Sequence, residues 1–237
     1  SNKERYIYMK IITETGLRKL IRTVIKEEAG GKHSGDYKEI WWSGIKKLPS
    51  DGPSHVTGNY WVNNNALKDL VGAPSVVDGD FNAHKNMLTS FKGIEKTVIK
   101  GGLEVSGNNI KNLKGLPKKI GKGISLSENP LTSLKGLPST VNGDLELNET
   151  KIKSLEGAPK IVNGSFLAMD CKSLKSLKGI PKVIKGHFYI EGAPIKVTEE
   201  EVRALCKVGG RVETAWGKRT LDPDSMRGST RGGASTM

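Results

Sequence analysis

The sequence predicts an elongated solenoid of stacked coils, with one short parallel β-strand in each coil. Three observations lead to this fold class. The pattern of Thr140 to Pro159, TVNGDLELNETKIKSLEGAP, recurs every 21 or 22 residues along the chain. Each copy holds two apolar residues two positions apart, which is the period of a strand. Most copies then reach a Gly-x-Pro turn, and self-similarity at such a period indicates a repeat architecture.

The apolar pairs define the strands. Both members of a pair point to the same side of a strand, so both can face the interior of the coil. Two more apolar residues follow in each of the first six coils, as Leu67 and Leu70 do after the first pair. No coil can bury four apolar side chains alone, so we predict a stack of seven coils from about Ile45 to about Pro194. The pairs are Tyr60/Val62, Phe81/Ala83, Leu103/Val105, Ile124/Leu126, Leu145/Leu147, Phe166/Ala168 and Phe188/Ile190.

A polar column follows the pairs, at the place where the chain leaves each strand. An Asn side chain can bond to backbone groups there, and stacked Asn residues would form a ladder that satisfies buried backbone. Thr and Cys are poorer substitutes for Asn at this place. Glu95 likewise replaces the Pro of the Gly-x-Pro turn in one coil. The column consists of Asn65, Asn86, Asn108, Asn129, Thr150 and Cys171.

These motifs resemble those of the leucine-rich repeat family. The 21-residue unit, which lacks a convincing helix on its back, is similar to the short bacterial repeats of that family. The wording LTSLKGLPSTVNGDLELNETKIKSLEGAP resembles repeats in proteins of large tailed bacteriophages. The resemblance covers about 150 residues and implies a leucine-rich repeat solenoid with turn or polyproline-like returns. It implies a protein-binding scaffold that works through its sheet face, and it carries over no catalytic residue.

Residues 1–44 are predicted to form an N-terminal capping segment. Helical spacing of the apolar residues predicts an amphipathic helix from about Thr15 to Ala29, and Trp41 and Trp42 are expected to cover the first coil. Three roles for the helix remain open: a cap, a segment that docks into a partner groove, and a cleavable delivery peptide. The apolar stripe consists of Leu17, Leu20, Ile21 and Val24.

Residues 195–217 are predicted to form a C-terminal capping helix and its extension. Thr198 and Glu201 have capping-box spacing, and Lys207 followed by Gly209-Gly210 is expected to end the helix. The apolar face that seals the last coil is expected to hold Val202, Leu205 and Cys206. Residues 218–237 are rich in Gly, Ser and Thr and are predicted to be disordered unless a partner holds them. The chain thus divides into 1–44, 45–194, 195–217 and 218–237.

Composition narrows the classes of function. No apolar stretch is long enough to span a membrane and no secretory signal is visible, so we expect a protein of the cytoplasm of a bacterial or phage-infected cell, or of a virion. The net charge is +13, yet residues 45–194 carry 21 Lys, 13 acids and no Arg. Arg is the usual residue for reading phosphate and bases, so nucleic-acid binding is possible but disfavoured. Neither the two Cys nor the four His have metal-ligand spacing, so no cofactor is expected.

The residues beside each inward pair point out of the sheet and form its outward face. Three such columns hold 21 positions, with five acids (Asp80, Glu104, Asp144, Glu146 and Glu191) and no Lys, so an acidic face is predicted on a basic protein. Near its C-terminal end an apolar patch is expected to mark an interaction site, unless the C-terminal segment folds over it or Met169 turns inward. The candidate partner-binding residues are Leu167, Met169, Tyr189, Glu146, Glu104, His84, Asn82 and Trp61.

The sequence favours a binding protein over an enzyme. It contains no nucleophile elbow, phosphate-binding loop, dinucleotide fingerprint or zinc motif. Asp144 and Glu146 share a strand face, but solvated carboxylates on an open sheet are poor catalysts. The leading hypothesis is a non-enzymatic scaffold that binds another protein. Its rivals are a structural component of an assembly such as a phage particle, attached through its terminal segments, and a Lys-driven polyanion binder.

Overall fold

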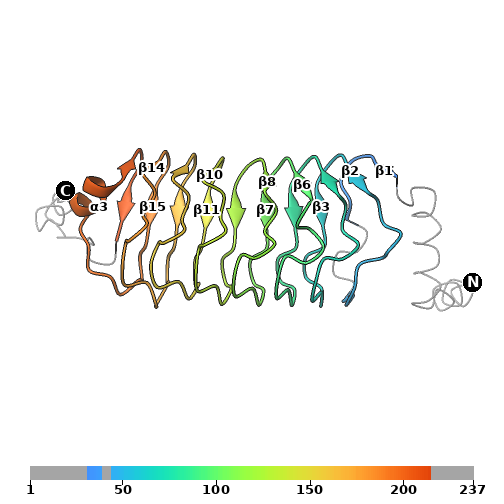
Figure 1. Ribbon diagram of the computed structural model, residues 1–237, viewed down its shortest axis with the longest axis horizontal. Helices are drawn as coiled ribbons and strands as arrows, with labels where there is room; N and C mark the ends of the chain where they lie inside the picture. Colours follow the sequence, from blue (N-terminus) through green and yellow to red (C-terminus); the bar gives the residue numbers. More distant parts are fainter. Residues whose placement is uncertain (1–30, 39–43, 215–237) are drawn as a thin grey trace, which may run out of the picture.

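The computed structural model describes residues 31–38 and 44–214 of the 237-residue chain. Over these residues the chain winds into a parallel β-solenoid of about eight turns (Figure 1). Each turn lays short strands beside those of the turns before and after it, so the molecule is longest in the stacking direction. The solenoid predicted from the repeat is therefore confirmed.

The largest sheet consists of eight parallel strands of two residues each. Leu145 aligns with Ile124 on one side and with Phe166 on the other, as the repeat register requires. The prediction of seven coils is one too few, because Val212–Glu213 adds an eighth strand after the C-terminal helix. The strands are β3 (Tyr60–Trp61), β5 (Phe81–Asn82), β7 (Leu103–Glu104), β9 (Ile124–Ser125), β11 (Leu145–Glu146), β13 (Phe166–Leu167), β15 (Phe188–Tyr189) and β17 (Val212–Glu213).

The inward side of this sheet forms the core. Leu145 and Leu147 have no exposed surface, and Phe81, Leu103 and Ile124 are aligned strand to strand. Aromatic rings also contact one another along this direction, with 5.4 Å between the centroids of the tilted rings of Phe166 and Phe188. Burying one such large apolar side chain contributes about 1.5–3 kcal/mol, so every turn gains stability only where a neighbouring turn covers it.

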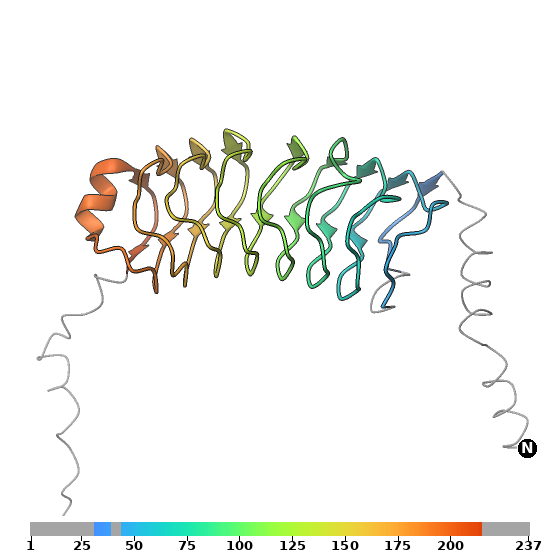
Figure 2. The ribbon, with the colours of Figure 1, turned by 60° about the horizontal axis from the view of Figure 1, so that its bottom comes forward.

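Strands also line a second side of the turns, which corrects the prediction of strands on one face with turn or polyproline-like returns (Figure 2). The Val and Ile residues near the end of each repeat favour extended backbone, and one residue of each pair points inward. These strands are β1 (Lys32–His33), β2 (His55–Val56), β4 (Val76–Val77), β6 (Val98–Ile99), β8 (Lys119–Ile120), β10 (Thr140–Val141), β12 (Ile161–Val162), β14 (Val183–Ile184) and β16 (Lys207–Val208).

The second row of strands is divided between β8 and β10 into sheets of five and four strands. A column of stacked glycines runs between the two rows of strands, and most of its N–H groups donate to the carbonyl oxygen one turn earlier. A Cβ at Gly101 would overlap the Gly79 carbonyl oxygen, which explains why glycine is needed in this column. Lys122 interrupts the column two residues after β8, in the turn where the second row is divided.

The Asn column forms the predicted ladder. The side-chain amide of Asn129 donates to the carbonyl oxygens of Val105 and Leu126 at 3.0 and 3.1 Å, and its Oδ1 accepts the N–H of Ile110 at 2.9 Å. Thr150 contributes less, because its hydroxyl donates to Leu147 O at 2.8 Å and otherwise meets Cys171 Sγ. Asn129 therefore joins its own turn to the preceding one through both its amide nitrogen and its amide oxygen.

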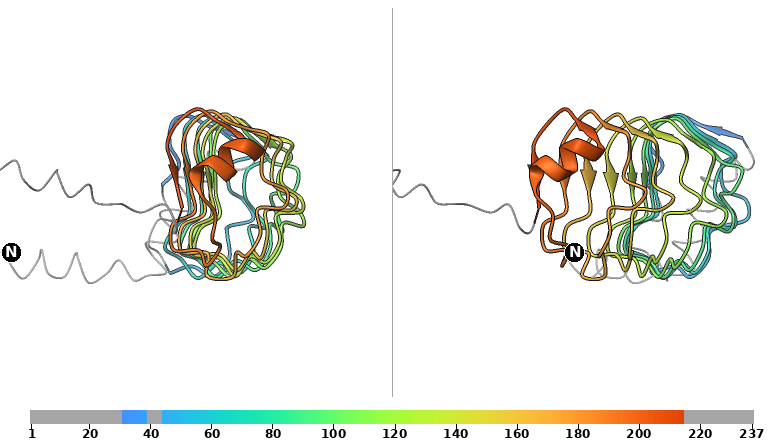
Figure 3. Two further views of the ribbon diagram at one scale, coloured as in Figure 1. Left: turned by 90° about the vertical axis from the view of Figure 1, so that its left-hand side faces the viewer. Right: turned by 60° about the vertical axis from the view of Figure 1, so that its left-hand side comes forward.

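The C-terminal end of the stack carries helix α3 (Glu199–Leu205), which lies across the last turn (Figure 3). Its capping box joins Thr198 and Glu201 as predicted. Lys207 and Gly209-Gly210 do not end the helix, because the chain becomes extended at Cys206 and pairs with β14. Val202 and Cys206 are buried as expected, whereas Leu205 is 60% exposed and does not seal the last turn.

Both rows of strands continue beyond the 45–194 range, since β1 precedes it and β16 and β17 follow it. Tyr37 also pairs with Tyr60 ahead of the first predicted strand pair, with 5.2 Å between their ring centroids. The predicted helix of 15–29, Trp41, Trp42 and the tail of 218–237 lie outside the described residues.

Candidate binding face of the eight-stranded sheet

The central outward column runs along the whole sheet in register. Its side chains are half-buried, except that of Ser125, which is 9% exposed. The column carries three acids, and two of them, Glu146 and Glu213, flank the adjacent apolar residues Leu167 and Tyr189 near its C-terminal end. The column consists of Trp61, Asn82, Glu104, Ser125, Glu146, Leu167, Tyr189 and Glu213.

The apolar patch consists of Leu167, Met169 and Tyr189. Leu167 and Tyr189 are register partners on β13 and β15, and Met169 follows Leu167 by two residues on the same side. The three side chains are half-buried rather than fully exposed. The ring of His187 stacks on Tyr189 at 5.3 Å between centroids and 8° between planes, which holds the phenol in place.

The other predicted site residues lie toward the N-terminal end. Asn82 and His84 form one unit, because Asn82 Oδ1 lies 2.7 Å from His84 Nδ1. Lys38 Nζ lies 4.2 Å from the centroid of the Trp61 ring, so a cation–π contact covers part of that ring. Trp61 is two strands from Glu104 and Leu167 is three strands beyond Glu104, so Trp61 and the apolar patch lie five strands apart on the face.

The column before the central one has a structural role that the sequence did not reveal. In it, a side-chain acceptor of one turn receives the backbone N–H of the next turn. Asn59 Oδ1 accepts from Asp80 at 2.7 Å, Asp80 Oδ1 accepts from Gly102 at 2.7 Å, and Asp144 Oδ1 accepts from Ser165 at 2.6 Å. At its start, the N–H of Asn59 lowers the pKa of Asp36, and Lys38 adds to that effect. Asp80 and Asp144 thus each use one oxygen to bind consecutive turns together.

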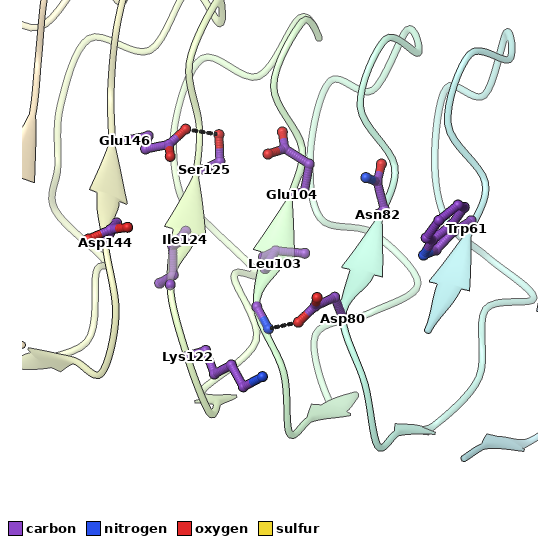
Figure 4. A pocket seen from close by; sticks show the side chains of 12 residues that line it. Trp61, Asp80, Asn82, Leu103, Glu104, Lys122, Ile124, Ser125, Asp144 and Glu146 are labelled. Atoms are coloured by element: carbon purple, nitrogen blue, oxygen red, sulfur yellow. Dashed lines mark hydrogen bonds between the residues drawn. The ribbon is translucent and has the colours of Figure 1, made fainter. Parts of the chain in front are cut away.

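This ladder is interrupted at Gly102 and Gly123, which have no side chain to offer. The N–H groups of Gly123 and Asp144, which follow them, have no hydrogen-bond partner among the described residues. The missing side chains leave a hollow of about 400 Å³ on the sheet face (Figure 4). Its floor includes Leu103 and Ile124, and Lys122 lies at its lower edge in this view.

Four carboxylates surround the hollow, and each keeps one oxygen free of protein hydrogen bonds within the described chain. Besides the ladder bonds of Asp80 and Asp144, Glu104 Oε1 accepts the N–H of Ser106 at 2.9 Å, and Glu146 Oε2 accepts the hydroxyl of Ser125 at 3.1 Å. None of the four forms an ion pair with a described residue, although carboxylates elsewhere on the described surface do. The hollow therefore presents a concentration of unneutralised negative charge.

Sequence reasoning identified these acids as outward but missed the hollow that groups them. The available signal was the column Asn59, Asp80, Gly102, Gly123, Asp144, in which glycine twice replaces an Asp or Asn. Recognising it requires knowing that this column accepts N–H groups from the next turn.

Within the described part of the chain, no group of three or more His, Cys, Asp or Glu residues is arranged to hold a metal ion. No helix among the described residues has the length and apolar character needed to cross a membrane.

Comparisons of the chain with models of known protein families and with curated proteins find no match.

Proposed function

We propose that this protein is a non-enzymatic binding scaffold of the leucine-rich repeat type, which engages a partner protein through the outward side of its eight-stranded sheet. This proposal rests on Leu167 and Tyr189, which are aligned on neighbouring strands. Two half-buried apolar side chains lie side by side on a rigid sheet, and Glu146 and Glu213 flank them. A central apolar anchor with a polar rim is the arrangement in which interface hot spots occur.

The rigidity of the patch favours binding. Its strands are held in register by the backbone bonds from Leu147 to Leu167 and from Ala168 to Tyr189, both of 2.7 Å. Asn148 Oδ1 also accepts the N–H of Met169 at 2.9 Å. A partner that contacts this patch orders few new backbone groups, so less of the interaction energy is lost to conformational entropy.

A role without catalysis fits the open setting of the acids. Asp144 is exposed, and water screens a carboxylate on an open sheet. The two described cysteines are buried and free, which suits a reducing compartment such as the cytoplasm of a bacterial or phage-infected cell, or a virion assembled there.

The experiment is a quantitative pull-down with the full chain and a variant that combines Leu167→Ala and Tyr189→Ala. The matched control is Ile161→Ala, which removes apolar surface from the second row of strands, where Ile161 is 36% exposed. We expect the specific partner to be lost with the double variant and kept with the control. A partner list that is the same for all three proteins would reject the patch as the binding site.

A Lys-driven polyanion binder is the second candidate. The exposed column Lys92, Lys114, Lys135 and Lys178 on the flank of the solenoid favours it. Two of these residues are already paired, Lys92 with Asp69 and Lys178 with Glu156, which reduces the charge that the column offers. Polyanion binding should weaken steeply between low and moderate salt, whereas binding at the apolar patch should not.

A structural role in an assembly such as a phage particle is the third candidate. It depends on the terminal segments, which lie outside the described residues. Deletion of residues 1–30 should then stop co-purification with particles, and particles that retain the truncated chain would reject this role.

A further inference from the structure

We propose that the hollow around Gly102 and Gly123 binds a Lys- or Arg-bearing segment of the partner protein. The inference rests on the proposed function, since it names the chemistry of a partner on the same sheet face. The hollow lies on the turns of β3 to β11, apart from the apolar patch on β13 and β15, so the two regions can be tested separately.

Charge selects a cationic occupant. Asp80, Glu104, Asp144 and Glu146 surround the hollow without an ion pair to any described residue, and Lys122 is the one cation in its lining. The chain as a whole carries a net charge of +13, so a cationic segment is repelled by most of the molecule and attracted here. An anionic ligand would be repelled by four carboxylates and attracted by one amine, that of Lys122.

The unused hydrogen-bonding groups select a peptide segment. The free N–H groups of Gly123 and Asp144 are available to donate to a ligand, and the free carboxylate oxygens are available to accept from one. A peptide supplies both, because its backbone carbonyls accept and its Lys or Arg side chains donate. A simple metal cation would bind through the carboxylate oxygens alone and would make no use of the two N–H groups.

The dimensions also fit a short extended segment. Asp80 and Asp144 are three turns apart, which is about 14 Å at the usual strand spacing. An extended chain covers that distance with about four residues. Glu104 and Glu146 are two turns apart, about 10 Å, and lie on the central column beside this path.

The hollow is open because of glycine, and packing demands glycine less strictly at one of the two positions. A Cβ at Gly123 would approach Asp144 O to 2.8 Å, which is too close, but a Cβ at Gly102 would lie 3.2 Å from the nearest atom, Gly123 O. Serine is already used in this column, since Ser165 Oγ accepts the N–H of His187 at 3.1 Å. Gly102→Ser therefore provides an acceptor for the Gly123 N–H and partly fills the hollow.

The acids can be neutralised without removing their ladder bonds. Asn59 accepts the N–H of Asp80 in the same way that Asp80 and Asp144 accept theirs, so Asn is a suitable replacement at both positions. Gln at 104 and 146 retains an acceptor oxygen for Ser106 and Ser125. The test variant is Asp80→Asn, Glu104→Gln, Asp144→Asn and Glu146→Gln. The control is Glu95→Gln, Glu128→Gln, Glu149→Gln and Glu200→Gln, which changes the net charge equally on exposed positions outside the hollow.

The probe is rhodamine-labelled pentalysine, measured by fluorescence anisotropy against the full chain at low salt. We expect saturable binding that the test variant weakens by roughly tenfold or more, that Gly102→Ser also weakens, and that the control variant preserves. Carbodiimide coupling of bound pentalysine to wild-type carboxyl groups, mapped by mass spectrometry, should yield bonds at the four acids of the hollow.

Three results would overturn the inference: no binding of pentalysine, equal binding by the test and control variants, or coupling mainly at other carboxyl groups. The coupling map uses the wild-type chain, so it decides the question even if a variant does not fold. A negative result here leaves the Leu167 and Tyr189 pull-down unaffected. If the double variant at Leu167 and Tyr189 still captured the partner while the wild-type chain bound pentalysine, the patch would be rejected and the hollow kept.

Discussion

The side-chain amide of Asn129 donates a hydrogen bond of 3.0 Å to the carbonyl oxygen of Val105, which lies 24 residues earlier in the chain. The same carbonyl receives Asn108 of the preceding turn at 3.0 Å. One buried backbone oxygen thus serves two consecutive members of the column. This shared acceptor fixes the geometry of successive turns, because buried backbone groups must find hydrogen-bond partners within the protein.

Asn129→Ala should be strongly destabilising. Asn129 is 2% exposed, and its removal leaves buried backbone groups of Ile110, Leu126 and Ser127 with one hydrogen bond fewer. We expect a loss of about 2–4 kcal/mol in the free energy of unfolding, measured by urea denaturation. The exposed Asn109, which follows Asn108 in the preceding turn, provides the control, since Asn109→Ala should change stability by less than about 0.5 kcal/mol. Similar stabilities for the two variants would contradict the ladder.

Adjacent glycines should differ in their tolerance of a methyl group. A Cβ at Gly101 would overlap the Gly79 carbonyl and Asp80 Oδ1, whereas one at Gly102 approaches only Gly123 O, at 3.2 Å. Gly101→Ala should therefore cost about 1–3 kcal/mol in unfolding free energy, and clearly more than Gly102→Ala. Thermal unfolding followed by circular dichroism compares the two variants directly. The reverse order would show that the turns are not stacked as described.

The repeat predicted one row of strands well and the other row poorly. Leu145 and Leu147 predict a strand, because two apolar residues two positions apart are typical of a strand with one buried side. The second row depends on adjacent Val or Ile residues, such as Val76-Val77, and two consecutive apolar residues fit a turn as well as a strand. Tertiary pairing between turns decides which of the two forms.

The hollow could not be predicted from the sequence, because it depends on the absence of side chains at two positions of a ladder that only the structure reveals. Asp80 and Asp144 look like free surface acids in the sequence, yet each is fixed by a backbone N–H of the following turn. Gly102 and Gly123 look like ordinary turn residues, yet they interrupt the same ladder. The last strand was also missed, since Gly209-Gly210 resembles a helix stop and Thr214 takes the place of the second apolar residue.

The cap of α3 should depend on Thr198 and not on Leu205. Thr198 accepts the N–H of Glu201 at 3.2 Å, while Leu205 is 60% exposed. Loss of an N-cap costs about 1 kcal/mol, so the amide of Cys206, which bonds to Val202 O, should exchange roughly fivefold faster in Thr198→Ala. Native-state hydrogen exchange measures this. If Leu205→Ala had the larger effect, the helix would pack through a different face.

Alkaline pH should destabilise the protein through Cys206. Burial raises the pKa of the Cys206 thiol from 9.0 to about 11. A raised pKa means that the folded state holds the proton more tightly, so the contribution is complete below pH 9 and is lost as the pH rises through about 11. Urea denaturation of wild type and Cys206→Ala at several pH values isolates this group from the lysines. Their difference in unfolding free energy should shrink by about 2 kcal/mol between pH 8 and pH 11, and a constant difference would contradict the assignment.

The most direct test of the solenoid and its outward face is a distance between two side chains on the central column. Asn82 and Tyr189 are five strands apart in the same sheet, which corresponds to about 24 Å. Spin labels on Asn82→Cys and Tyr189→Cys, measured by double electron–electron resonance, should give one narrow distribution centred near that value. A broad distribution, or a distance far above about 24 Å, would contradict the account, because the turns would then not present one outward side chain per strand in register.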